Sequence, residues 1–354
     1  MLRLLFVRVS SFPLKSLSSQ LHKTCVANMS MKAVVVHEYG DSSKLSYEDV
    51  PIPEPEKGEV LVKNHFCGVN FIDIVVRNGH MGKLFPLNST LGFEGSGVVE
   101  KVGSDVEGIS KGDNVAYIGV GVGSYSEFSK VPSWRVIKAP QGVSLEKAAS
   151  TLWQGLTAYC FTEAVFPIKP DTKVLIQGVA GGVGNLLCQL AKLKGAYVIG
   201  TCSTEVKAAR ARAAGADEVI LYSQKDFVEE TKRLTDGKGV NVIYDGVGKT
   251  TFLKGFDCLA SRGTMVLFGG ASGNPDPIDP TMLGKGSYFL TFASHIPYTS
   301  DPTLYRKMAT ELFQLVADGK IDFGSVEKIP LVDAKKSHDN LQNRKSAGKI
   351  LLVP

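Results

Sequence analysis

The sequence predicts an α/β protein in which a doubly wound parallel sheet is joined to a second, strand-rich domain. Three observations support this prediction. Strand and helix patterns alternate from about residue 144 onward, glycine-punctuated strands fill the part before it, and a glycine-rich turn joins one strand of the alternating part to the helix that follows. Such alternation is typical of a parallel sheet covered by helices on both faces.

The glycine-rich turn is the most informative stretch. Residues 173–177 form a short apolar run expected to be a buried strand. The next helix should bury one face carrying Leu186, Leu187, Leu190 and Leu193. Between them, Gly178, Gly181, Gly182 and Gly184 would let backbone amides approach a pyrophosphate at the helix N-terminus. A second strand at 197–201 completes a βαβ unit, so a dinucleotide site is favoured over a tight turn without a ligand.

The end of the second strand favours NADPH as the cofactor. In an NAD site, an Asp or Glu about 20 residues beyond the glycines binds the ribose hydroxyl. This chain has Gly-Thr-Cys-Ser at 200–203 and no carboxylate there. The Ser203 hydroxyl and the Lys207 ammonium would attract a 2′-phosphate, although Lys207 also fits a solvated helix face. Glu205 is interpreted as a first-turn acid that complements the helix dipole.

Length and composition indicate a two-domain globular protein. The chain has 354 residues, of which 44% are hydrophobic and 21% charged. No uninterrupted apolar run reaches 18 residues, so no membrane span is expected. Residues 1–30 hold four of the 40 basic residues and no acid, which leaves 36 basic against 35 acidic residues in the remainder. A nearly neutral body argues against a nucleic-acid surface built by bulk charge.

The first thirty residues have the composition of a mitochondrial transit peptide. They are basic and serine-rich, with Leu2, Leu5, Phe6 and Val9 at helical spacing. The alternatives are an extension preceding initiation at Met29 or Met31, which would leave the protein cytoplasmic, and a secretory signal, which Arg8 disfavours. The six cysteines lack CxxC spacing and are expected to be reduced core residues: Cys25, Cys67, Cys160, Cys188, Cys202 and Cys258.

The other elements follow from local patterns. Strands are expected at 31–37, 59–67, 91–103, 111–117, 218–221, 241–245, 264–268 and 348–353, with 260–264 as a turn. Ser144 should cap one helix, and Asp301 or Thr303 another. Residues 269–275 should form a loop beside the cofactor, at the carboxyl end of a strand. The apolar run 287–292 suits an exposed edge strand, which predicts a homodimer.

Several ordered motifs together resemble the medium-chain dehydrogenase/reductase superfamily, and within it the zinc-free NADPH:quinone oxidoreductases of the zeta-crystallin group. The motifs are Gly-Val-Asn-Phe-Ile-Asp at 68–73, Gly-Phe-Glu-Gly-Ser-Gly at 92–97, Gly-Leu-Thr-Ala-Tyr at 155–159, Ala-Gly-Gly-Val-Gly at 180–184, Tyr-Asp-Gly-Val-Gly at 244–248 and Phe-Gly-Gly-Ala-Ser-Gly at 268–273. The resemblance implies a GroES-like β-barrel catalytic domain at 31–153 and 293–354, and a Rossmann NADPH-binding domain at 154–292.

The same resemblance implies that the chain lacks a catalytic zinc ion. In the zinc enzymes of the superfamily, a Cys ligand stands where this chain has Asn70, and a His where it has Phe93. Neither an amide nitrogen nor a phenyl ring is a zinc ligand, and the cysteine quartet of the structural zinc lobe is missing as well. Glu94 is then expected to be a buried hydrogen-bonding residue. Without a Lewis acid, quinones and activated α,β-unsaturated carbonyls are the expected acceptors.

The resemblance also assigns site residues. Asn70 would lie near the nicotinamide, unless it is only a turn residue, and Asp73 would fix its loop; these two are the catalytic candidates. The cofactor candidates are Thr157 at the carboxamide side of the ring, Gly181, Gly182 and Val183 at the pyrophosphate, Ser203, Lys207, Tyr222 and Arg344 at the adenosine phosphate, and Phe268, Gly269 and Ser272 in the cofactor loop. For Arg344, a solvated helix end is the alternative.

Departures from the family pattern affect the acceptor pocket. Val75 and Met81 stand where tyrosines are frequent, Phe292 where an Arg is frequent, and Val179 replaces a smaller residue. We therefore expect an apolar pocket, with proton delivery from solvent and His80 as a weak donor candidate. The alternatives are a mitochondrial enoyl-thioester reductase, disfavoured because its tyrosine would fall at Met81, and a non-catalytic NADPH-binding crystallin or RNA-binding protein.

Overall fold

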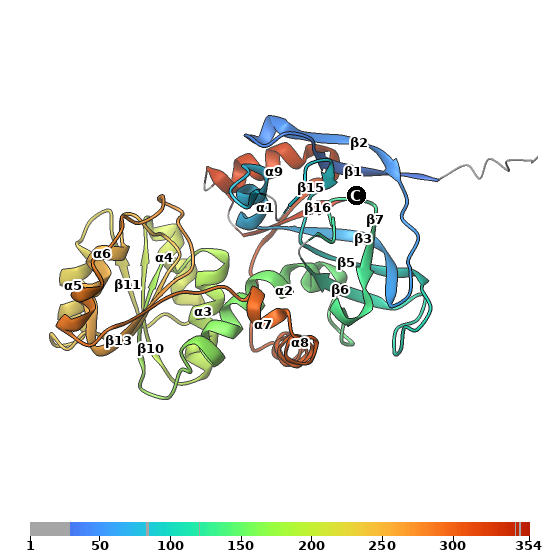
Figure 1. The fold of residues 1–354 in the computed structure, drawn as a ribbon. Coiled ribbons are helices and arrows are strands. Elements are labelled where there is room, and N and C mark those ends of the chain that lie inside the picture. Colours follow the sequence, from blue (N-terminus) through green and yellow to red (C-terminus); the bar gives the residue numbers. More distant parts are fainter. Residues whose placement is uncertain (1–28, 83–84, 120, 344, 347) are drawn as a thin grey trace, which may run out of the picture.

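The computed structural model describes residues 29–82, 85–119, 121–343, 345–346 and 348–354. Two bodies lie side by side, a parallel α/β sheet and a β-barrel, and the C-terminal segment returns to the barrel (Figure 1). This architecture confirms the predicted fold class. The expected leader lies outside the described residues except for its last two positions, and Arg344 lies outside them too. No helix in the described part is long and apolar enough to cross a bilayer.

The Rossmann sheet has six parallel strands in the order β11-β10-β9-β12-β13-β14. Their bounds are β9 Lys173–Gln177, β10 Tyr197–Cys202, β11 Glu218–Leu221, β12 Val240–Asp245, β13 Leu259–Leu267 and β14 Phe289–Phe292. The helices between them are α3 Gly182–Leu193, α4 Glu205–Ala213, α5 Phe227–Leu234 and α6 Phe252–Gly255. The strand order reverses beside β9, and ligands of such sheets bind at this switch point.

Two details differ from the sequence-based expectation. β13 begins at Leu259, because the expected turn at 260–264 is a bulge inside the strand: Arg262 has a φ of +62° and the β12–β13 register shifts there. Leu193 is 49% exposed, since α3 ends at this residue and its last turn leaves the core. The other three leucines of the expected face are buried.

The barrel is built from a seven-stranded sheet and a three-stranded one. The larger contains β3 Glu59–Val69, β5 Glu94–Val102, β6 Asn114–Ile118, β7 Phe128–Pro132, β8 Val136–Lys138, β15 Val326–Pro330 and β16 Lys349–Val353. The smaller contains β1 Ser30–Val36, β2 Leu45–Pro51 and β4 Ser89–Thr90. β16 pairs with β3 in antiparallel register, so the last strand of the chain lies against one of its earliest.

Helix α2, Leu145–Cys160, connects the two bodies (Figure 1). The Ser144 side chain caps it by accepting from Lys147 N at 3.2 Å, as predicted. α2 contacts β3, β5, β6 and β16 of the barrel and α3 of the Rossmann domain. One continuous cluster of buried apolar side chains therefore runs from the barrel through α2 into the parallel sheet.

Further helices complete the junction and the barrel. α7, Ile296–Thr299, and α8, Pro302–Ala317, follow β14, and α8 packs on α2. Asp301, and not Thr303, caps α8 by accepting from Leu304 N at 2.7 Å. α1, Phe71–Arg77, contacts α9, Ala334–Gln342, across the barrel end.

Candidate active site at the junction of the two domains

The glycine-rich turn has the geometry of an anion site. Gly178 has a φ of +72°, and α3 begins at Gly182 without a side-chain cap from the described residues, so its first amides remain available to an anion. A Cβ at Gly184 would lie 2.5 Å from the Gly178 carbonyl oxygen, and one at Gly182 would overlap the Gln154 side chain. The glycines are therefore required by close backbone approach, and the turn fits the pyrophosphate of a dinucleotide.

The turn is anchored to the neighbouring strand β10. Thr201 Oγ1 donates to Gln177 Oε1 at 2.7 Å and accepts from Gly178 N at 3.2 Å. Gln177 Nε2 is buried and has no hydrogen-bond partner among the described residues. A buried donor of this kind is expected to pair with a ligand atom or a water. Val179 fits here because β10 places Gly200 against it, where a Cβ would be only 2.5 Å from the valine side chain.

The groups expected to bind the adenosine phosphate gather where β10 and β11 end. Ser203 is half-buried, and its carbonyl accepts from Ser223 Oγ at 3.0 Å, while the neighbouring Tyr222 is 47% exposed. Lys207 lies in the first turn of α4, and its ammonium has no ion pair within the described part of the chain. Glu205 pairs with Arg212 at 3.4 Å. A positive charge without a carboxylate partner fits a 2′-phosphate.

The loop after β13 is fastened to the loop after β12. The Ser272 hydroxyl donates to the Val247 carbonyl at 2.8 Å and accepts from Thr250 N at 3.1 Å. The Phe268 ring packs on Gly246, where a Cβ would lie 2.8 Å from it, and Gly269 follows at the same carboxyl edge. These contacts hold the predicted cofactor loop at the edge where the glycine-rich turn also lies.

A fully buried charged cluster lies on the barrel side of the junction. Lys349 Nζ donates to Glu94 Oε2 at 2.6 Å and to Asn70 Oδ1 at 2.8 Å, and Asn70 Nδ2 donates to the same Glu94 oxygen at 3.0 Å. The other oxygen, Oε1, accepts from Trp153 N of α2 at 2.8 Å. The Lys349 and Glu94 side chains are 1% and 0% exposed. Gly68 is required beside them, since a Cβ there would overlap the Glu94 carboxylate.

A second buried chain of hydrogen bonds positions the Asn70 backbone. Asp73 Oδ2 accepts from Asn70 N at 2.6 Å and from the Tyr125 hydroxyl at 3.0 Å. Arg77 donates to His338 Nδ1 at 3.1 Å, so the other ring nitrogen carries the hydrogen that faces Tyr125 at 3.2 Å. Burial raises the pKa of Asp73 to about 7, and burial followed by the Arg77 charge lowers the pKa of His338 to about 3.

The donor set of this cluster does not fit zinc. The Phe93 ring packs on Trp153 at 5.6 Å, and the Asn70 amide is occupied by Lys349 and Glu94. The described residues contain no group of three or more His, Cys, Asp or Glu side chains placed to hold a metal ion. The ammonium of Lys349 supplies the positive charge that Glu94 faces, and Glu94 is a buried hydrogen-bonding residue as predicted.

The structure pairs Thr157, a predicted site residue, with His295, which the sequence did not single out. Thr157 is buried and donates to the Trp153 carbonyl at 2.7 Å, while His295, which follows β14, contacts its hydroxyl at 3.1 Å. His80, the weak proton-donor candidate, is exposed beyond the end of α1. Lys349 and His295 were missed because each reaches the site only through contacts distant in sequence. A His just beyond the carboxyl end of a parallel strand was the one available signal.

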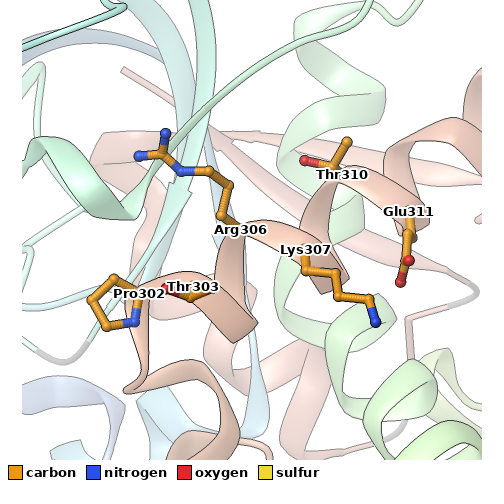
Figure 2. Close-up of a pocket in the computed structure, with 6 residues that line it drawn as sticks. All are labelled: Pro302, Thr303, Arg306, Lys307, Thr310 and Glu311. Carbon is orange, nitrogen blue, oxygen red and sulfur yellow. The ribbon is translucent and has the colours of Figure 1, made fainter.

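A separate surface hollow lies on the outer side of α8. Figure 2 shows its lining residues, all from one helix: Pro302, Thr303, Arg306, Lys307, Thr310 and Glu311. None of them belongs to the glycine-rich turn or to the buried cluster around Asn70. The candidate active site is therefore defined by the side chains at the domain junction and not by this hollow.

Comparison with known proteins finds matches for both the barrel and the nucleotide-binding domain. Residues 56–141 match the alcohol dehydrogenase GroES-like domain, and residues 182–300 match the zinc-binding dehydrogenase family. Quinone oxidoreductase 1 of Escherichia coli is 39% identical over 324 residues, which cover 90% of this chain and 98% of that protein. A 2-haloacrylate reductase of Burkholderia is 35% identical, over 91% of this chain and 98% of that protein.

Solved structures show the same relationship. The crystal structure of Escherichia coli quinone oxidoreductase complexed with NADPH has a TM-score of 0.87 and 38% identity, and the match covers 91% of this chain and all of that one. A mycobacterial structure complexed with NADPH also has a TM-score of 0.87, with 39% identity over 92% of this chain and all of that one.

Proposed function

This chain belongs to the quinone oxidoreductase family of the medium-chain dehydrogenases/reductases, and on that premise we propose that it reduces quinones or activated α,β-unsaturated carbonyls with NADPH. The observation that carries the proposal is a glycine-rich turn that fits a pyrophosphate, together with a β10 end that has no carboxylate at 200–203 and is followed by Lys207 in the first turn of α4. Relatives named for quinone and haloacrylate reduction define the range of acceptors.

One set of residues binds NADPH, and another polarises the acceptor. NADPH, when bound, supplies the hydride. The amides that begin α3 hold its pyrophosphate, and Ser203, Lys207 and Tyr222 hold its 2′-phosphate. At the acceptor, the Lys349 ammonium at 2.8 Å polarises the Asn70 amide, one N–H of which donates to Glu94 at 3.0 Å. The other N–H has only a long contact of 3.4 Å with the Gly68 carbonyl, and it is the donor that can turn to an oxygen that gains negative charge. The Asp73 carboxyl keeps the Asn70 backbone in place for that role.

The test is a panel of acceptors assayed with NADPH and with NADH. The panel contains ortho- and para-quinones, aliphatic enones, a 2-haloacrylate and enoyl thioesters, and nucleotide oxidation is followed for each. We expect turnover with quinones or activated enones and a preference for NADPH. Turnover confined to enoyl thioesters, or the absence of NADPH oxidation with every acceptor, contradicts the proposal.

We also propose that two copies associate through β14. This strand ends the sheet order, and its side chains Phe289 and Phe292 are 61% and 71% exposed. An exposed apolar edge strand pairs readily with a second copy of itself, which would bury these rings. A Phe289→Lys, Phe292→Glu variant should be monomeric by light scattering, while the parent is a dimer. A monomeric parent contradicts this proposal.

For cellular location, we propose that residues 1–30 direct import into mitochondria. The support is their composition alone: four basic residues, no acid and repeated serines. Import assays with isolated mitochondria should show membrane-potential-dependent processing that is lost in an Arg3→Glu, Arg8→Glu variant. Unprocessed chain that remains accessible to protease contradicts the proposal.

A further inference from the structure

His295 lies at the carboxyl edge of the Rossmann sheet, where the two domains meet. Ala293 N still donates to the Leu267 carbonyl at 2.7 Å, so the chain leaves the sheet beside β13 just before His295 and then begins α7. The side chain is buried, with the residue 4% exposed. In a doubly wound sheet, this edge is the one that faces a bound dinucleotide.

The neighbours of His295 come from α2, the helix that also contacts the glycine-rich turn. The imidazole packs edge-on against the Trp153 ring, with centroids 4.6 Å apart and planes at 86°, and its Nδ1 lies 3.1 Å from Thr157 Oγ1. Gln154, between these two positions, packs on Gly182 at the start of α3. His295 and the turn that fits the pyrophosphate thus both contact the same stretch of α2, residues 153–157.

The hydrogen-bond geometry determines which ring nitrogen of His295 carries the proton. The Thr157 hydroxyl donates to the Trp153 carbonyl at 2.7 Å, so its oxygen can only accept from His295 Nδ1–H. Nε2 therefore carries a lone pair and is an acceptor. Burial lowers the pKa of His295 to about 4, so the ring is neutral near pH 7.

His295 Nε2 has no hydrogen-bond partner among the described residues although it is fully buried. Buried polar atoms in native proteins are nearly always paired, and an unpaired acceptor at a ligand edge indicates a donor that arrives with the ligand. In NADPH, the group that follows the pyrophosphate toward the substrate domain is the nicotinamide, whose carboxamide carries two N–H donors. A nicotinamide that extends from the start of α3 toward the Asn70 cluster would pass along α2, which contacts both.

We propose that His295 Nε2 accepts a hydrogen bond from the nicotinamide carboxamide and so fixes the orientation of the ring toward the acceptor. The inference rests on the proposed function, because it needs NADPH as the bound nucleotide. Hydride transfer depends on that orientation, since a ring rotated about its glycosidic bond presents the wrong face. Thr157 acts behind His295 by fixing its tautomer.

The experiment compares NADPH with its acetylpyridine analogue, in which a methyl ketone replaces the carboxamide and both N–H donors are lost. Nucleotide affinity is measured by fluorescence titration, which requires no acceptor turnover. For His295→Leu, we expect the Kd of NADPH to rise about tenfold, the equivalent of one buried hydrogen bond, while the Kd of the analogue stays within about twofold of the parent. His295→Gln retains an acceptor and should recover most of the NADPH affinity.

His65→Leu serves as the matched control, because His65 is exposed on β3 of the barrel and should leave both affinities unchanged. Thermal unfolding of each variant verifies that it is folded. Equal losses for both nucleotides in His295→Leu would mean that Nε2 pairs with a water or serves packing alone, and an unchanged NADPH affinity would mean that it pairs with nothing; either result overturns the inference. A parent that does not bind NADPH overturns the proposed function instead.

Discussion

Replacing Lys349 by methionine removes the only ammonium within hydrogen-bond reach of Glu94 in the described structure. The two side chains form a 2.6 Å pair that is 1% and 0% exposed, and methionine preserves most of the buried volume. After the change, Glu94 keeps two donors, Asn70 Nδ2 at 3.0 Å and Trp153 N at 2.8 Å. The carboxylate is then buried with hydrogen bonds but without a compensating charge.

The expected cost follows from that geometry. Removing one partner of a buried ion pair destabilises a protein by about 3–5 kcal/mol, because the remaining charge is left desolvated. The two surviving hydrogen bonds place Lys349→Met near the lower end, at about 3 kcal/mol. In Glu94→Gln, the ammonium keeps neutral amide oxygens as acceptors but loses its compensating charge, so the cost should be of similar size. The double variant removes both charges and should be more stable than either single variant.

Urea unfolding measures these differences. Both tryptophans, Trp134 and Trp153, lie close to the barrel, and the Trp153 backbone contacts Glu94 directly, so intrinsic fluorescence reports on this unit. Lys32→Met is the matched control, since the pair that Lys32 forms with Asp49 is 41% and 61% exposed, and its midpoint should equal that of the parent. The reasoning is refuted if Lys349→Met also matches the parent, or if the double variant costs the sum of the two single ones.

Three further predictions concern the cofactor and pH. Lys207→Glu should lower kcat/KM for NADPH at least tenfold, since a carboxylate repels the 2′-phosphate, and should leave kcat/KM for NADH nearly unchanged. A variant that still prefers NADPH contradicts the role of Lys207. Gly184→Ala should weaken NADPH binding about tenfold or more, because its Cβ would lie 2.5 Å from a backbone carbonyl oxygen and displace the turn. Gly284→Ala is the control, since Gly284 faces open space and its replacement should leave the affinity unchanged. Equal affinities of the two variants for NADPH would show that the close backbone approach at Gly184 is not required. Burial raises the pKa of Asp73 from 3.8 to about 7, so the folded chain keeps a proton that the unfolded chain releases in that interval, and stability from this group falls as pH rises through it. Asp73→Asn should remove that part of the pH slope in urea unfolding, and an unchanged slope would show that the carboxyl is ionised throughout.

The Rossmann half was predictable from the sequence because its signals are local. The strand at 173–177, the glycine spacing and the helical leucines all lie between residues 173 and 193, and each determines its own element. The prediction of a turn at 260–264 was wrong because it rested on local signals alone, and pairing with a neighbouring strand overrides them. Arg262 and Gly263 have turn chemistry, but pairing with β12 keeps the chain extended around a bulge.

The buried cluster was only partly predictable. Asn70, Asp73 and Glu94 lie in motifs that the resemblance covers, and Glu94 is buried as expected. Lys349 was interpreted only as part of a terminal strand, because its contact with Asn70 spans 279 positions and no local pattern encodes it. His295 gave no periodic signal either, and its role emerges only from an unpaired nitrogen and the direction of the Thr157 hydroxyl.

Helix α2 carries a mechanical consequence. Its sixteen residues form one continuous helix that is followed by a π-helical turn at Phe161–Val165. The helix packs against both domains. Gln154 contacts the glycine-rich turn, and the neighbouring Trp153 amide donates to Glu94 in the buried cluster. A tilt of α2 would therefore move the nucleotide-binding turn and the Asn70 cluster together. The two parts of the candidate site are therefore coupled through α2, and a substitution on its barrel side should also change the affinity for NADPH.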